Sequence, residues 1–217
     1  MTESTGGPVL TLPEAEAALL REQYAKADVI LEYGSGGSTV LAAGMPGKTV
    51  TSVESDAAWA AMIATHVAGM KRAESVVVRH VDIGPTHKWG APTSRSAAPK
   101  FPDYPLAVWS DPGFRHPDVV LIDGRFRPAC FAAVAMKIEK PVTVLFDDYD
   151  TRDRYKTVER LSPPVELTGR MARFELTPGP VPKEHLDWII STFVEPDYAN
   201  RHGLSRVVEQ LKLRLLG

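Results

Sequence analysis

The sequence predicts an α/β fold in which helices cover both faces of a mostly parallel, doubly wound sheet. Two observations predict it. Short apolar runs rich in β-branched residues alternate along the chain with segments whose apolar residues recur at helical spacing. The short runs are apolar throughout, which is typical of parallel strands buried on both faces. Parallel neighbours need long crossover connections, and the intervening helices supply them.

In chain order, the pattern predicts a helix at 11–27, a strand at 29–31, a short helix ending near 43, a strand at 49–53, a helix at 56–70, strands at 75–81, 118–122 and 142–146, and helices at 129–137 and 151–161. Thr11 is the expected cap of the first helix, with Pro13 in its first turn. The helix after Asp56 is expected to bury one face made of Trp59, Met62, Ile63, Val67 and Met70.

The last third of the chain predicts a change of strand direction. The strand-like segments 165–168 and 171–176 are separated by only two residues, which is too short for a crossover. We therefore expect an antiparallel pair, followed by closing helices at 183–193 and 205–216.

Composition narrows the class of protein. The chain has 217 residues, of which 44% are hydrophobic and 24% charged, with a net charge of −2. These values are typical of a soluble globular protein, and no linker divides the chain, so we expect one domain over 1–217. No apolar run approaches the ~18 residues of a membrane helix, and the first residues lack signal-peptide order, so we expect a cytoplasmic protein without a membrane partner. The balanced charge disfavours nucleic acid as a partner, and the pattern does not indicate an oligomeric state.

Carboxylates follow the predicted parallel strands, at the place where each strand ends. Ligands of open α/β sheets bind beyond these carboxyl ends. One such acid is equally well explained as the cap of the next helix, but five strand ends in succession indicate a functional edge. The acids are Glu32, Glu54, Asp82, Asp123, and the pair Asp147 and Asp148.

The turn after the first strand is rich in glycine, which allows the backbone to approach a ligand closely. Gly34 and Gly36 match the first two glycines of a dinucleotide fingerprint, but Thr39 stands where the third is required. Glu32, just before the turn, would repel a pyrophosphate and suits a ligand with a cationic amino group. Glu54, at the end of the second strand, suits a grip on ribose hydroxyls.

These residues resemble the first motif of the class I S-adenosylmethionine-dependent methyltransferases, which is an acid followed by G-x-G and a small residue. The motif is matched by Glu32, Gly34, Gly36 and Ser38, and the resemblance spans about 29–176. It implies a seven-stranded sheet of order 3-2-1-4-5-7-6 in which strand seven is antiparallel.

The resemblance also implies a set of cofactor contacts. Glu54 would hold the ribose, Ser55 would lie beside the adenine, and Asp82 with the backbone of Ile83 would contact the adenine edge. The residues expected to bind S-adenosylmethionine are Glu32, Tyr33, Gly34, Ser35, Gly36, Ser38, Glu54, Ser55, Asp82, Ile83 and Asp123.

Asp123, Asp147 and Asp148 are the candidate catalytic residues. Their placement is similar to that in catechol-type O-methyltransferases, where an Asp on strand four and an Asp-Asn pair on strand five bind a divalent metal that lowers the pKa of the acceptor hydroxyl. Asp148 stands where that group has Asn. Two alternatives stay open: Mg²⁺ bound by the three carboxylates, or a metal-free site in which Asp123 or Asp148 is the general base. Arg125 and Arg127 are expected to pair with these acids, and the alternative is that they bind an acidic acceptor.

The proline-rich segment at about 84–117 is too long for an ordinary connector, and loops of this length are usually functional or disordered. We expect an insertion that acts as a lid, with a disordered excursion as the alternative. The lid residues would be His87, Lys88, Trp89 and Tyr104. None of the six histidines forms a metal-spaced pair, and Cys130, the lone cysteine, excludes an intrachain disulfide and is expected to be a buried apolar residue.

The sequence therefore predicts an enzyme that transfers the methyl group of S-adenosylmethionine to oxygen on a small-molecule acceptor. The alternatives are an NAD-dependent oxidoreductase and a non-catalytic S-adenosylmethionine-binding module. The segment 145–151 is also similar to the D-x-D-x-T loop of haloacid-dehalogenase-like phosphatases, but it follows the fifth strand instead of the first.

Overall fold

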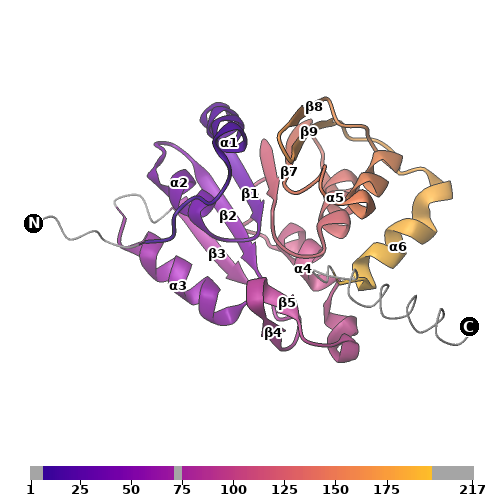
Figure 1. Ribbon diagram of the computed structural model, residues 1–217, viewed down its shortest axis with the longest axis horizontal. Coiled ribbons are helices and arrows are strands. Elements are labelled where there is room, and N and C mark those ends of the chain that lie inside the picture. Colours follow the sequence, from indigo (N-terminus) through magenta and orange to yellow (C-terminus); the bar gives the residue numbers. More distant parts are fainter. Residues whose placement is uncertain (1–6, 71–74, 197–217) are drawn as a thin grey trace, which may run out of the picture.

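The computed structural model describes residues 7–70 and 75–196 and contains a seven-stranded sheet with helices on both faces (Figure 1). The sheet strands are β1 (Val29–Tyr33), β2 (Thr49–Glu54), β3 (Val76–His80), β6 (Val119–Ile122), β7 (Val142–Phe146), β8 (Glu166–Thr168) and β9 (Met171–Leu176). The α-helices are α1 (Glu14–Lys26), α2 (Gly37–Gly44), α3 (Ala57–Ala68), α4 (Asp103–Leu106), α5 (Arg127–Lys137) and α6 (Leu186–Val194). A small separate hairpin pairs β4 (Thr86–His87) with β5 (Ala91–Pro92). Short 3₁₀ helices span Lys88–Gly90, Arg95–Lys100, Ala107–Ser110, Asp153–Arg160 and Lys183–His185.

The strand order is β3-β2-β1-β6-β7-β9-β8. With the small hairpin left out of the count, this is the predicted order 3-2-1-4-5-7-6. β1 pairs in parallel with both β2 and β6, whereas β9 runs antiparallel to β7 and to β8, as predicted. The chain moves outward from β1 in one direction and then returns to place β6 on its other side. The carboxyl ends of β1 and β6 therefore form the switch point at which open α/β sheets bind ligands.

Two buried clusters cover the two faces of the sheet. Alternate residues of a strand point to opposite faces, so Ile30 packs towards α1 while Leu31 packs towards α5. All residues of β1 and β6 are buried; β6 is apolar throughout, whereas β1 buries the carboxylate of Glu32 among its apolar residues. The prediction that every parallel strand is buried on both faces is wrong for β3, where Val77 is 50% exposed, because this strand lies at the edge of the sheet.

Several element boundaries differ from the sequence pattern. The first helix begins at Glu14, and Thr11 does not cap it; Pro13 occupies the cap position without a side-chain hydrogen bond. The segment expected as a helix at 151–161 is the 3₁₀ helix Asp153–Arg160, and the one at 183–193 is divided between a 3₁₀ turn and α6. The helix expected at 205–216 lies outside the described residues.

The buried face of α3 is narrower than predicted. It consists of Ala60, Ile63 and Val67, while Trp59 and Met62 are 41% and 39% exposed. Trp59 lies at the edge of this face because its indole Nε1 donates a hydrogen bond to the carbonyl of Ser35 at 2.7 Å. The helix thus presents this tryptophan to the turn after β1 instead of to the core.

The proline-rich segment is packed against the sheet, so the alternative of a disordered excursion is wrong. Phe101, Tyr104 and Val108 are fully buried. The rings of Phe101 and Tyr104 lie 5.0 and 5.7 Å from the ring of Phe126. Tyr104 is therefore a core residue and not a lid residue. Figure 1 shows the β4–β5 hairpin projecting from the lower edge of the sheet. No helix within the described parts of the chain is long and apolar enough to cross a membrane.

Replacing Phe101 with alanine tests whether the insertion belongs to the cooperative core. Because the ring is fully buried among aromatic side chains, we expect Phe101→Ala to lower the free energy of unfolding by about 3–5 kcal/mol. The measurement is urea unfolding followed by circular dichroism. Lys88→Ala, at an exposed position of the same insertion, is the matched control and should change stability by less than about 0.5 kcal/mol. Equal effects of the two substitutions would contradict this packing.

Candidate functional site

The turn after β1 is built on contact between two glycines. Gly34 has a φ of +105°, and a Cβ there would lie 2.7 Å from the backbone nitrogen of Gly124, which follows β6. The N–H of Gly34 donates to the carbonyl of Val53 at 2.8 Å, so the turn is also tied to β2. A Cβ at Gly36, in contrast, would meet nothing within 4 Å. The turn is closed on the protein side and has open space beside Gly36.

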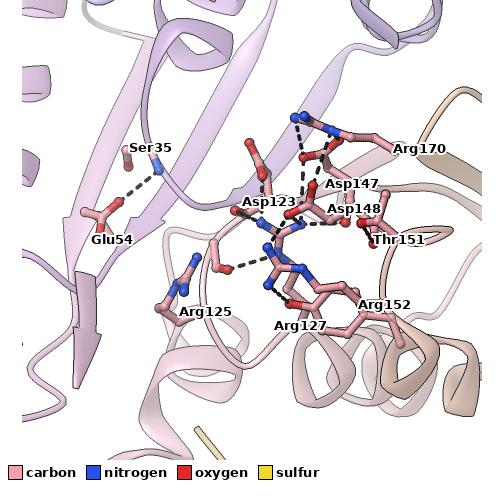
Figure 2. A network of polar contacts seen from close by, with 12 residues as sticks. Ser35, Glu54, Asp123, Arg125, Arg127, Asp147, Asp148, Thr151, Arg152 and Arg170 are labelled. Atoms are coloured by element: carbon pink, nitrogen blue, oxygen red, sulfur yellow. Dashed lines mark hydrogen bonds and ion pairs between the residues drawn. The ribbon is translucent and has the colours of Figure 1, made fainter. Parts of the chain in front are cut away.

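The side chain of Glu54 also connects this turn to the end of β2. Its Oε1 accepts hydrogen bonds from the N–H groups of Ser55 at 2.7 Å and Asp56 at 2.9 Å. Its Oε2 accepts from the N–H of Ser35 at 3.2 Å, a contact that Figure 2 shows. Three backbone donors therefore set the orientation of a carboxylate that is itself only 8% exposed.

Glu32 lies beneath the turn and not at its surface. The side chain is 0% exposed, and its oxygens accept hydrogen bonds from the hydroxyls of Tyr24 at 2.7 Å and Thr39 at 2.5 Å. Burial raises the pKa of Glu32, and these hydrogen bonds oppose the rise. The Thr39 hydroxyl also accepts from the N–H of Gly36 at 3.0 Å. The residue at the third fingerprint position thus connects Glu32 to the turn, a role that the sequence did not reveal.

Two other expected cofactor contacts lie at the end of β3. Asp82 is exposed, accepts a hydrogen bond from the N–H of Gly84 at 2.8 Å and pairs with Lys100 Nζ at 2.5 Å. The hydrogen bond from Lys100 is the largest of the effects that lower the pKa of Asp82. Ile83 is fully buried beside it, so that only its backbone is suited to a polar contact.

The β4–β5 hairpin is docked against Glu54. The Ser55 hydroxyl donates to the carbonyl of Gly90 at 2.8 Å, and a Cβ at Gly90 would lie 3.0 Å from Oε1 of Glu54. The preceding residue, Trp89, has a φ of +65° and is 72% exposed. A bulky side chain in this backbone region is rare, and such strain tends to cluster at ligand sites.

Arg127 joins the three candidate catalytic carboxylates (Figure 2). Its Nη2 lies 2.9 Å from Oδ1 of Asp123, and its Nη1 lies 3.4 Å from Oδ2 of Asp148 and 3.8 Å from Oδ2 of Asp147. The same guanidinium donates to the backbone carbonyls of Asp123 at 2.8 Å, Gly124 at 3.1 Å, and Asp147. The expected pairing of Arg127 with these acids is confirmed.

Two further arginines complete the network. Arg170 binds Asp147 in a bidentate manner, with Nε and Nη2 at 2.9 and 3.0 Å from the two carboxylate oxygens. Arg152 donates to Oδ2 of Asp148 at 2.8 Å. Sequence reasoning missed both residues. The position of Arg170 in the tight turn between β8 and β9, which returns next to β7, was the available signal.

The three acids have different environments. Burial raises the pKa of Asp123 to about 7, against the attraction of Arg127 and together with repulsion by Asp147 and Asp148. Although burial opposes it, the hydrogen bond from Arg170 and the charge of Arg127 lower the pKa of Asp147. The side chain of Asp123 is 39% exposed, against 2% for Asp147 and 17% for Asp148. Asp123 is thus the most exposed of the three acids, although it is still half-buried.

This donor set does not fit a divalent metal. Both oxygens of Asp147 are bound by Arg170, and Arg127 faces all three carboxylates. A cation coordinated by these oxygens would stand beside two guanidinium charges. Across 7–70 and 75–196, no group of three or more His, Cys, Asp or Glu side chains is arranged to hold a metal ion.

The structure brings the turn, Ser35, Glu54 and Asp123 to one edge of the sheet, as the strand-end rule predicted. The side chain of Tyr33, another expected cofactor contact, belongs to the core, and its hydroxyl donates to the carbonyl of Pro105 at 2.7 Å.

The N-terminal segment, which sequence reasoning did not assign to the site, passes over the start of α2. A Cβ at Gly37 would lie 2.3 Å from the backbone nitrogen of Leu10.

Comparison with known proteins identifies solved structures that are related to this chain. No protein-family model matches the sequence, and no curated protein matches it. The crystal structure of a methyltransferase-like protein from Silicibacter pomeroyi is 52% identical, covers 88% of this chain and 99% of its own, and superposes with a TM-score of 0.83.

More distant structures share the fold. The O-methyltransferase TomG from Streptomyces achromogenes, solved in complex with SAM, is 18% identical over 79% of this chain and 82% of its own, with a TM-score of 0.50. Cofactor-bound Rv0187 from MTB is 16% identical over 79% and 84%, with a TM-score of 0.52. With a 52% identical methyltransferase-like relative over nearly the whole of that relative's length, the chain belongs to the class I S-adenosylmethionine-dependent methyltransferase family, with a Rossmann-like fold.

Proposed function

We propose that the chain binds S-adenosylmethionine and transfers its methyl group to a hydroxyl oxygen of a small molecule. The observation that carries this proposal is the carboxylate of Glu54, held by three backbone N–H groups against the glycine turn. A fixed carboxylate at this place accepts hydrogen bonds from both hydroxyls of a ribose. Its rigidity reduces the loss of side-chain entropy on binding.

The surrounding residues suit the rest of the cofactor. The open space beside Gly36 lies at the start of α2, and the N-terminal end of a helix favours a carboxylate such as that of the methionine moiety. In this proposal Glu32 supports the turn from below through Thr39. Ser55 lies on the adenine side of Glu54, next to the β4–β5 hairpin. The other proposed contacts are Tyr33 and Gly34 through their backbones, Ser35, Ser38, Asp82 and Ile83.

We assign the general base to Asp123, because it is the most exposed acid of the cluster. As the acceptor oxygen attacks the methyl carbon, the O–C bond forms and the C–S bond breaks. The electron pair of the broken bond returns to sulfur, leaving S-adenosylhomocysteine. The hydroxyl proton passes to Asp123. Asp147 and Asp148 contribute by holding the arginines and by raising the pKa of Asp123.

Replacing Glu54 tests cofactor binding. Because Glu54→Gln removes a charge-assisted contact, we expect the Kd for S-adenosylhomocysteine to rise about 10–150-fold, corresponding to about 1.5–3 kcal/mol. Isothermal titration calorimetry measures it, with NAD as the comparison ligand. Glu22→Gln, on the exposed face of α1, is the matched control. If the folded wild type bound NAD tightly and bound neither S-adenosylmethionine nor S-adenosylhomocysteine, the proposal would be overturned.

Asp123 governs the expected pH dependence. The base must be deprotonated, and the pKa of Asp123 is about 7, so the rate should rise roughly tenfold per pH unit below pH 7 and level off above it. Asp123→Asn should lower kcat by about 10²–10⁴-fold and leave cofactor affinity within a few-fold. The measurement is transfer of a labelled methyl group to a panel of phenols and alcohols. Bound cofactor without transfer to any acceptor would indicate a non-catalytic module.

Trp89 is expected to cover the adenine, as part of a lid formed by the β4–β5 hairpin. Its exposed ring is attached to a segment that contacts Ser55 and Glu54. Stacking of a base on an aromatic ring contributes about 1–3 kcal/mol, so Trp89→Ala should raise the Kd for S-adenosylhomocysteine roughly 5–150-fold. Trp89→Phe should recover most of the affinity, while Thr93→Ala, at an exposed position just after the same hairpin, should not change it. Unchanged affinity in Trp89→Ala would remove the hairpin from the cofactor site.

A further inference from the structure

Ser35 lies between two glycines in the turn after β1, and side chains from other elements hold it in place. Gly34 and Gly36 leave the backbone on both sides of Ser35 with many accessible conformations. The Ser35 N–H donates to Oε2 of Glu54 at 3.2 Å (Figure 2). The Ser35 hydroxyl contacts that of Ser52 at 2.7 Å, which fixes the side chain but not the peptide group that follows it. The orientation of Glu54 therefore depends on what holds the Ser35 backbone.

The peptide group that joins Ser35 to Gly36 is bound at both of its polar atoms. Its carbonyl oxygen, which belongs to Ser35, accepts a hydrogen bond from the indole Nε1 of Trp59 at 2.7 Å. Its N–H, which belongs to Gly36, donates to the hydroxyl of Thr39 at 3.0 Å, and that hydroxyl donates to Glu32 at 2.5 Å. The buried acid thus holds one side of this peptide group through Thr39, and the tryptophan on α3 holds the other.

Trp59 is also connected to Glu54 through the first turn of α3. The N–H of Trp59 donates to Oδ1 of Asp56, the N-cap of this helix, at 2.9 Å. The N–H of Asp56 donates in turn to Oε1 of Glu54 at 2.9 Å. The hydrogen bonds therefore form a closed circuit that leaves Glu54 along α3 and returns to it through the turn after β1. The indole supplies the one side-chain donor of this circuit, so its substitution leaves the backbone donors in place.

We propose that Trp59 is a positioning residue for the cofactor: its indole N–H fixes the backbone of Ser35, and so holds the Glu54 carboxylate in the orientation that accepts both ribose hydroxyls. This role rests on the proposed binding of S-adenosylmethionine, and it acts through Glu54 and not through contact with the ligand. It also gives a reason why a tryptophan in helical register with the core is 41% exposed. The apolar ring lies against the helix while its polar edge holds the turn.

Trp59→Phe removes the indole N–H and keeps an aromatic ring. We expect this variant to raise the Kd for S-adenosylhomocysteine about 3–10-fold, as the loss of one hydrogen bond does. Isothermal titration calorimetry gives the Kd. Trp109→Phe is the matched control, because its indole Nε1 also donates a hydrogen bond, to the hydroxyl of Tyr33 at 2.8 Å. Both variants should lose about 2–4 °C of Tm, and only Trp59→Phe should lose affinity.

Dependence on the ribose hydroxyls separates positioning of Glu54 from a general loss of packing. The 2′,3′-dideoxy analogue of S-adenosylhomocysteine lacks both hydroxyls that the carboxylate would bind. Trp59→Phe should therefore leave the Kd for this analogue within about twofold of the wild-type value. In a chain that already carries Glu54→Gln, Trp59→Phe should change the Kd for S-adenosylhomocysteine by less than about twofold, because the group that it positions is already altered.

A second measurement needs no substitution. Coupling between two sites is reciprocal, so a cofactor that binds more tightly because of the Trp59 hydrogen bond must stabilise that bond by the same factor. S-adenosylhomocysteine should therefore slow the solvent exchange of the Trp59 indole N–H about 3–10-fold in the wild type, as followed by nuclear magnetic resonance. The exchange of the indole N–H of Trp188, on α6, should stay unchanged.

The outcomes distinguish this role from the proposed function. A wild type that binds no S-adenosylhomocysteine would overturn both. If the wild type binds it and Trp59→Phe binds it with the same Kd, the positioning role alone is wrong. Equal weakening of S-adenosylhomocysteine and its dideoxy analogue would show that Trp59 only supports the packing of α3, and would also overturn this role. Should Trp59→Phe fail to fold, unchanged exchange of the wild-type Trp59 indole N–H on adding ligand would have the same consequence.

Discussion

The site depends on the contact between the backbones of Gly34 and Gly124. A Cβ on either glycine would lie within 3 Å of the other's backbone, so no larger residue fits without moving a strand-end loop. This approach sets the distance between the turn after β1 and the loop that begins with Asp123. Glu54 lies on one side of the contact and Asp123 on the other, and the spacing between these two carboxylates follows from it.

The second constraint is the burial of charge at the ends of β6 and β7. Carboxylates at neighbouring strand ends repel each other, and burial makes the repulsion stronger. The protein balances them with guanidinium groups from three different segments, of which Arg127 comes from α5 and Arg170 from the turn between β8 and β9. Because Arg170 takes both oxygens of Asp147, that acid stays ionised, while Asp123 keeps a raised pKa and an exposed side chain. Asp123 and Asp147 thus differ in pKa and in exposure, although both are aspartates at strand ends.

The sequence pattern was sufficient where a residue's role depends on its own strand or turn. The antiparallel pairing of β8 with β9 follows from the short connection between them, and the position of Glu54 follows from the strand-end rule, whereas the strand order is what the resemblance to the methyltransferase family implies. The pattern failed where a neighbour decides the role. Trp59 has helical spacing appropriate to a buried face, yet a carbonyl in another turn attracts its indole. Tyr104 lies in a proline-rich segment that resembles a surface loop, yet its ring fills the core beside Phe126.

By itself, the sequence determined the class of fold and the edge of the sheet at which the strand-end acids gather, because hydrophobic period and strand-end acids are local properties of the chain. Only the tertiary structure decided what each acid does. Glu32 is buried under Tyr24 and Thr39, Asp147 is bound by Arg170, and Asp123 is left open. These partners come from other elements of the fold, and the pKa and accessibility of a carboxylate depend on the groups that surround it in space.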